Sequence, residues 1–245
     1  MIHATLRSLL PAAVLVGLSI APLAGQAATA TETRNVPEFT AIAASGSVNI
    51  SVSQGPVSSV QVTADDAVLP NIETVVEAGK RGPTLLIRLK NEGSGWGWGK
   101  SYNTGPVNVV IVTPKLTGLA SAGSGDIRVG ALQTPTLQLS ISGSGNASLA
   151  GLSTDELGVS IAGSGDVRAD GRSGKLTVSI AGSGDVRLAD LRSDEVTVKI
   201  AGSGDAAVQA QKTLNVSIAG SGDVVYSGEA SVKSSVAGSG TVKKR

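Results

Sequence analysis

The sequence has 245 residues, with 20 basic and 19 acidic side chains, no cysteine, one histidine and only 2% aromatic residues. A charge this close to neutral gives no electrostatic reason to expect nucleic acid or anionic lipid as a partner. The absence of cysteine excludes disulfides and thiolate metal sites, and the only histidine, His3, lies in the first few residues.

Residues 1–30 have the pattern of a secretory signal peptide. Arg7 precedes an apolar run, and small residues end the segment at Ala30. Cleavage after Ala27 or Ala30 would release the mature protein into the periplasm or the extracellular space. The alternative is an uncleaved membrane anchor, but prolines bracket an apolar core that is too short to span a bilayer comfortably. We therefore expect a mature chain without a transmembrane segment.

Residues 31–115 show strand patterns without a regular repeat. Val48, Ile50 and Val52 alternate with polar residues, which is typical of a strand with one buried face. Further strand candidates are residues 72–76, 85–89 and 107–112. This part is either a first irregular set of coils, with Ser45-Gly46-Ser47 as a decayed corner, or a small antiparallel sheet. Such a sheet would cap the open end of the repeat region that follows.

Residues 91–106 form a glycine-rich stretch that contains Trp96, Trp98 and Tyr102. Aromatic rings on loops often stack on sugars or on partner surfaces. These three residues are therefore the candidates for contact with a ligand or partner. The alternative is that the rings fold back over the N-terminal part as a small cluster.

Residues 116–245 carry a Gly-Ser-Gly phrase that recurs every 18 to 20 residues. Its first glycines are Gly123, Gly143, Gly163, Gly182, Gly202, Gly220 and Gly238. A fixed period near 20 residues is typical of a solenoid. Before each phrase apolar and polar residues alternate, as at Leu139, Ser140 and Ile141, so each repeat is predicted to be strand, corner, strand and turn. The repeat is too short for a propeller blade and has no helical spacing, which leaves a parallel β-helix.

Equivalent residues of successive coils should stack at roughly 4.8 Å. This stacking predicts an interior aliphatic ladder from Ile141 to Val236 and a separate column of glycine corners. Glycine is expected at the corners because it accepts positive φ and allows backbones to approach closely.

The position directly after each Gly-Ser-Gly phrase is acidic in five of the seven copies. It is occupied by Asp126, Asn146, Asp166, Asp185, Asp205, Asp223 and Thr241. Stacked carboxylates could bind Ca²⁺, but the calcium-binding solenoid repeat has about nine residues and this column lacks a second set of acids. Bonding to backbone amides in turns is the favoured role, and Arg128, Arg168 and Arg187 can offset the repulsion between the acids. We expect no metal and no cofactor.

Nothing in the repeat marks one coil as catalytic. Polysaccharide lyases and hydrolases built on β-helices need acids or bases gathered in a cleft, whereas charges here are evenly spread and turns such as residues 192–194 are short. Asp155, Glu156 and Asp170 are predicted to be solvated turn residues. We therefore expect no catalytic residues. Only residues 242–245 follow the last phrase, so the chain is not expected to be a complete auto-transporter.

The repeated Ser-Gly-Ser-Gly or Ala-Gly-Ser-Gly phrase, followed by Asp or Asn, resembles a bacterial family over about residues 36–245. This family is the putative auto-transporter adhesin, head GIN domain. The resemblance implies one right-handed β-helical domain that is exported, and it carries over no functional residue. We expect a non-catalytic binding or cell-envelope structural module whose partner is a glycan or an envelope component. The alternative is a carbohydrate-active enzyme, a polysaccharide lyase or hydrolase, on the same fold.

Overall fold

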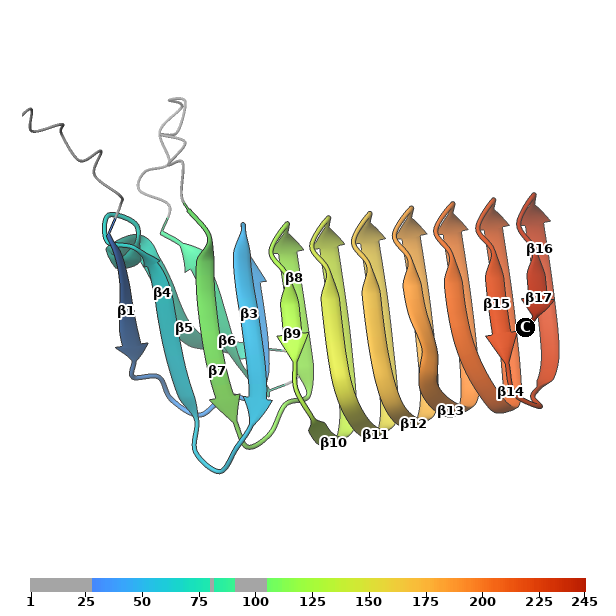
Figure 1. Ribbon diagram of the computed structural model, residues 1–245, viewed down its shortest axis with the longest axis horizontal. Coiled ribbons are helices and arrows are strands. Elements are labelled where there is room, and N and C mark those ends of the chain that lie inside the picture. Colours follow the sequence, from blue (N-terminus) through green and yellow to red (C-terminus); the bar gives the residue numbers. More distant parts are fainter. Residues whose placement is uncertain (1–27, 80–81, 91–104) are drawn as a thin grey trace, which may run out of the picture.

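A computed structural model describes residues 28–79, 82–90 and 105–245. Within these ranges the chain forms 17 β-strands and one short 3-10 helix, arranged as a row of stacked coils with a broader N-terminal end (Figure 1). The predicted parallel β-helix with an irregular β-rich N-terminal part is confirmed. Residues 1–27 of the predicted signal peptide lie outside the described residues, as do Trp96, Trp98 and Tyr102.

The N-terminal part contains β1 (Thr29–Arg34), β2 (Ala41–Ser45), β3 (Val48–Gln54), β4 (Ser59–Asp65), the 3-10 helix η1 (Leu69–Asn71), β5 (Ile72–Gly79), β6 (Gly82–Leu89) and β7 (Val107–Thr113). The repeat region contains β8 (Gly118–Gly123), β9 (Ile127–Val129), β10 (Leu132–Gly143), β11 (Ala147–Gly163), β12 (Val167–Gly182), β13 (Val186–Gly202), β14 (Ala206–Gly220), β15 (Val224–Ser227), β16 (Ser231–Gly238) and β17 (Val242–Lys244).

Two flanks of paired strands face each other across the core. We call flank A the series β1, β4, β7, β3 and β9, continued by the first halves of β11–β14 and by β15 and β17. Flank B is the series β5, β6, β2 and β8, continued by β10, the second halves of β11–β14 and β16. The chain passes from B to A at the Gly-Ser-Gly corner, which we call the first corner. It returns from A to B at a second corner near residues 133–135 of the first regular coil.

The stacking register is set by identical residues in the repeat. Ile161 of β11 lies beside Ile180 of β12, and Ile180 lies beside Ile200 of β13. All three side chains are buried, because every second residue of a strand points to the same face. The period-two alternation in the sequence therefore becomes the inside and outside of the coil.

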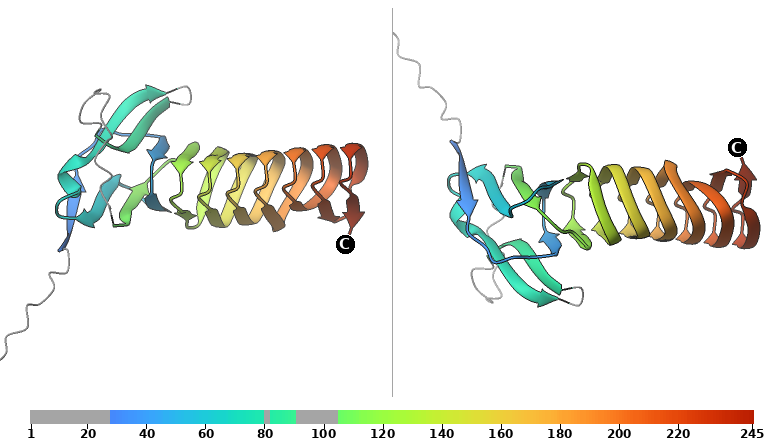
Figure 2. Two further views of the ribbon diagram at one scale, coloured as in Figure 1. Left: turned by 90° about the horizontal axis from the view of Figure 1, so that it is seen from above. Right: turned by 90° about the horizontal axis from the view of Figure 1, so that it is seen from below.

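The N-terminal part combines both predicted arrangements. Strands β2 and β3 form a coil that pairs in parallel with β8 and β9, and β6 and β7 pair in parallel with β2 and β3 on the other side. Strands β1, β4 and β5 are antiparallel and cover the end. The hairpin of β5 and β6 projects sideways from the rod (Figure 2). The coil order in space therefore differs from the order in the sequence.

One continuous hydrophobic cluster runs from Phe39 in the N-terminal part to Val224 near the other end. The predicted aliphatic ladder lies inside it from Ile141 to Ile218, but Val236 is 41% exposed. Its placement in the interior was wrong, because no described coil stacks beyond β16 to cover it. Within the described residues, no helix has the length and apolar character needed to cross a membrane.

Candidate functional site

The first corners form a column along one edge of the solenoid. The first glycine of each phrase has positive φ, as at Gly182 with φ of 137°. A Cβ atom on the second glycine, such as Gly184, would overlap the carbonyl oxygen of Gly165 in the neighbouring coil. The serine between them is exposed, and the Ser183 amide donates to the carbonyl oxygen of Gly163 at 2.9 Å. The glycines of the column therefore allow the backbones of successive coils to approach closely. The serines between them place a row of hydroxyl groups in solvent.

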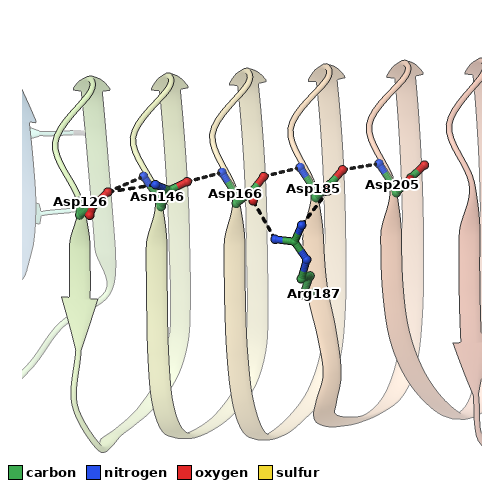
Figure 3. A network of polar contacts seen from close by, with 6 residues as sticks. All are labelled: Asp126, Asn146, Asp166, Asp185, Arg187 and Asp205. Carbon is green, nitrogen blue, oxygen red and sulfur yellow. Dashed lines mark hydrogen bonds and ion pairs between the residues drawn. The ribbon is translucent and has the colours of Figure 1, made fainter.

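Beside the glycines, the acidic positions form a ladder of hydrogen bonds (Figure 3). One side-chain oxygen of each residue but the last accepts the backbone amide of the equivalent residue in the next coil. The Asp185 amide donates to Asp166 Oδ1 at 3.0 Å, and the Asp205 amide donates to Asp185 Oδ1 at 3.1 Å. The same contact continues at Asp223 and ends at Thr241, whose amide donates to Asp223 Oδ1 at 2.8 Å. The ladder thus joins coil to coil through side chains, outside the regular strand pairing.

Asn146 makes the same contact as the acids, because its Oδ1 atom accepts the Asp166 amide at 3.1 Å. The ladder also begins earlier than the sequence predicts. Asn49 of β3 accepts the Asp126 amide through its Oδ1 atom at 3.0 Å. Asn49 was missed because its corner reads Ser45-Gly46-Ser47-Val48-Asn49, in which valine replaces the second glycine of the phrase.

Arg187 bridges two acids of the ladder through their second oxygen atoms (Figure 3). Its guanidinium lies 2.7 Å from Asp166 Oδ2 and 2.9 Å from Asp185 Oδ2. Partial burial acts to raise the pKa of Asp166, but the hydrogen bonds from Arg187 and the Asp185 amide outweigh it, and the net pKa lies below its usual value. The hydrogen bond to Asp166 raises the pKa of Arg187. Arg128 contacts a single acid of the ladder, Asp126, at 3.4 Å from its Oδ2 atom.

The ladder leaves few oxygen atoms for a metal ion. One oxygen of each acid accepts a backbone amide, and between Asp166 and Asp185 the other oxygen atoms are bound by Arg187. Ca²⁺ takes six to eight oxygen ligands. Among the described residues, no group of three or more His, Cys, Asp or Glu side chains is placed to hold a metal. The arrangement suits the joining of coils better than ion binding.

The second corner contains a column of buried hydroxyl residues that the sequence analysis missed. Its members are Thr113, Thr134, Thr154, Ser173 and Ser193. The Thr154 hydroxyl donates to the carbonyl oxygen of Glu156 at 3.1 Å, and the Ser173 hydroxyl donates to that of Lys175 at 2.8 Å. A buried hydroxyl group needs such a partner, and this local bond also fixes the turn. The signal was a Ser or Thr at a constant place in four successive periods, from Thr134 to Ser193, within a stretch that reads as an ordinary polar turn.

The outward face of flank B carries short side chains in register. One column contains Ser140, Ser160, Ser179, Lys199, Ser217 and Ser235, and the next contains Ser142, Ala162, Ala181, Ala201, Ala219 and Ala237. Most of these residues are exposed. Because the side chains are short and the strands are parallel, this flank presents a repetitive surface of hydroxyl and methyl groups.

The structure does not bring the remaining acidic candidates together as a reacting pair. Asp155, Glu156 and Asp170 are exposed. Asp170 has a structural contact, because its Oδ1 atom accepts the Gly151 amide at 2.7 Å.

Comparison with protein families finds a match over residues 38–230 to the model described as putative auto-transporter adhesin, head GIN domain. Comparison with curated proteins finds no match. A putative adhesin from Bacteroides fragilis NCTC 9343 has a similar crystal structure, with 25% identity, a TM-score of 0.78, and coverage of 90% of this chain and 98% of that chain.

Two further crystal structures share the fold. A putative lipid binding protein from Parabacteroides distasonis ATCC 8503 has 24% identity and a TM-score of 0.70, with 89% of this chain and 96% of that chain covered. A putative adhesin from Parabacteroides merdae ATCC 43184 has 21% identity and a TM-score of 0.66, with 90% and 98% covered. These four descriptions name adhesins and a lipid binding protein.

Proposed function

Because this chain belongs to the putative auto-transporter adhesin, head GIN domain family, we propose that it is an exported, non-catalytic module for adhesin-like binding or cell-envelope structure. The observation that carries the proposal is the outward face of flank B. Its serine and alanine columns repeat in register from coil to coil. A rigid surface of this kind offers the same contact several times to an extended partner.

Repetition matters because each single contact of a short side chain is weak. When several equivalent contacts are held on one rigid body, binding of the first raises the effective concentration of the rest. Glycans and envelope polymers are also repetitive, so their spacing can be matched along several coils. The proposed partner is therefore a glycan or another component of the cell envelope.

The positions of the charged groups support a non-catalytic role. A glycosidase needs two carboxyl groups free to act on one bond, and the protein must hold them in a suitable cleft. In the ladder, Asp166 and Asp185 are bound by Arg187 and by backbone amides. At the second corner, Asp194 is bound by Lys212 at 2.8 Å. These three acids are thus engaged in contacts within the protein.

Export through a signal peptide is part of the proposal, and the start of β1 refines the cleavage site. Strand β1 begins at Thr29, and the carbonyl oxygen of Ala28 accepts the Asp66 amide at 3.0 Å. Cleavage after Ala30 would remove the first residues of this strand, whereas cleavage after Ala27 would keep its pairing with β4 intact. We therefore favour cleavage after Ala27.

Fractionation of a bacterial host that produces the full chain tests this function. The protein is expected in the periplasm, at the cell surface or in the medium, with Ala28 as its first residue by mass spectrometry. The exported protein should then be retained on an isolated cell-envelope fraction. Accumulation of the uncleaved chain in the cytosol, or exported protein that is not retained, would contradict the proposal.

A further inference from the structure

A groove of about 620 Å³ lies along the second corners of successive coils. One rim is the column Gln133, Ser153, Arg172 and Arg192, and the other is the column Pro135, Asp155, Gly174 and Asp194. Between them lie Thr134, Thr154 and Ser173 of the buried hydroxyl column. At the usual strand spacing, a groove across these coils extends about 14 Å. It is therefore long enough to hold a short extended ligand.

Two arginine side chains lie side by side on the first rim. The parallel register places Arg172 of β12 next to Arg192 of β13, and both are exposed. Arg172 Nε donates to Ser153 Oγ at 2.9 Å, which orients this guanidinium along the groove. Within the described part of the chain, no carboxylate forms a salt bridge with either group. The register thus holds two positive charges together without a protein anion between them.

None of the nearby acids forms a salt bridge with this pair in the described part of the chain, and this includes Asp170 and Asp190, which lie two residues before Arg172 and Arg192 on the same strands. Asp194 is on the opposite rim and is bound to Lys212 at 2.8 Å. Asp155 is on the same rim as Asp194, with Gly174 between them. By contrast, Arg187 lies between two carboxylates of the acidic ladder. The arginine pair is therefore available for an anion from outside.

The chemistry of the rim indicates what kind of anion fits. A guanidinium binds a carboxylate or sulfate through two parallel hydrogen bonds, and two adjacent guanidinium groups can share one such acid. The amide of Gln133 and the hydroxyl of Ser153 suit the hydroxyl groups of a sugar. We propose that the groove binds an acidic oligosaccharide, with one carboxylate or sulfate group of the ligand held between Arg172 and Arg192. This inference rests on the proposed binding function and adds to it a second contact surface, apart from the outward face of flank B, with a stated ligand class.

Calorimetric titration of the purified protein tests the inference with three probes. Tetragalacturonate carries carboxylates, a heparin tetrasaccharide carries sulfates as well, and maltotetraose is neutral. The wild-type protein should bind one or both acidic probes, and the binding should weaken as salt rises. The R172Q/R192Q variant should lose about tenfold or more in affinity, because two charge-assisted contacts are removed. Neither protein should bind maltotetraose measurably.

Two further variants separate loss of the groove contact from a general loss of positive charge and from unfolding. Arg168→Gln is the matched control, because Arg168 is also an exposed arginine of β12 but lies on flank A, away from the groove. It should bind like the wild type. Unlike Arg172, Arg192 has no side-chain hydrogen bond or ion pair within the described part of the chain, so Arg192→Gln alone should keep the melting temperature while it weakens binding.

The inference would be overturned if the wild type bound neither acidic probe, if neutral and acidic probes bound equally, or if R172Q/R192Q bound like the wild type. Retention of the wild type and of R172Q/R192Q on the envelope fraction distinguishes failure of the arginine groove from failure of the proposed function. If the wild type and R172Q/R192Q were retained equally, the arginine groove would be wrong and the binding function would stand. If an exported wild type were not retained at all, the proposed function would fail.

Discussion

A single methyl group at Gly184 should disrupt the stack at one coil, although φ at this residue is not positive. A Cβ atom there would overlap the Gly165 carbonyl oxygen and lie 3.1 Å from both the Gly165 carbonyl carbon and Ile161 Cγ2. The obstructing group is backbone, so it cannot rotate away as a side chain could. Neighbouring coils would have to move apart, which stretches the ladder of amides beside the corner.

The expected cost of Gly184→Ala is about 3 kcal/mol, at the upper end of the range for inserting a methyl group into a packed region. For a chain of this size, that corresponds to a fall in melting temperature of roughly 6–12 °C. Gly130→Ala is the matched control, because φ is not positive there and a Cβ atom would lie 3.7 Å from the nearest atom, the Val52 carbonyl oxygen. Its unfolding free energy should change by less than about 1 kcal/mol. Thermal and urea unfolding followed by circular dichroism measure both, and equal melting temperatures for the two variants would refute the close approach of backbones at the corner.

Other predictions concern the acidic ladder. Asp185→Asn should change the unfolding free energy by less than about 1 kcal/mol, because an amide oxygen can still accept the Asp205 amide, as Asn146 does for Asp166. Asp185→Ala should be the more damaging variant, because it removes the acceptor, and the reverse order in urea unfolding would argue against the ladder. Because the folded-state pKa of Asp166 is lowered, its stabilisation is present above the unfolded pKa of about 3.9 and is lost as pH falls through the lower folded value. Asp166→Asn should therefore flatten the dependence of the urea midpoint on pH below about 4, and an unchanged slope would count against this linkage. EDTA should leave the melting temperature unchanged, whereas a large drop on chelation would revive the calcium hypothesis.

The regular coils could be predicted because equivalent positions recur in every repeat, and these positions fix how successive coils align. Leu139 and Ile141 alternate with polar residues, and the same pattern returns after each corner. When equivalent residues stack, one alternating segment determines which side chains face inward in every coil. The buried positions of Ile161 and Ile180 follow directly from this rule.

The N-terminal part was less predictable because its pairing is not sequential. Strands β2 and β3 lie between the coil of β6 and β7 and the coil of β8 and β9. Local patterns identify such strands, but they do not state which distant strand pairs with which. The corner at Gly46 has lost part of its phrase, so Asn49 gave no clear signal as the start of the ladder.

The candidate site was predicted in part. The acidic column and its contact with backbone amides follow from the known preference of Asp and Asn for turns. The buried hydroxyl column did not follow, because Thr154 and Ser173 read as polar turn residues until their bonds to carbonyl oxygens are seen. The pairing of Arg172 with Arg192 also required the register, since one coil is a residue shorter than the next.

The most direct test of a non-catalytic binding module is mass analysis of envelope glycans incubated with the immobilised protein. The proposed function predicts that glycans are retained on the protein and are recovered with their masses unchanged. Glycans released as shorter fragments or as fragments with unsaturated ends would contradict it, and so would an envelope fraction from which the protein retained neither a glycan nor any other component.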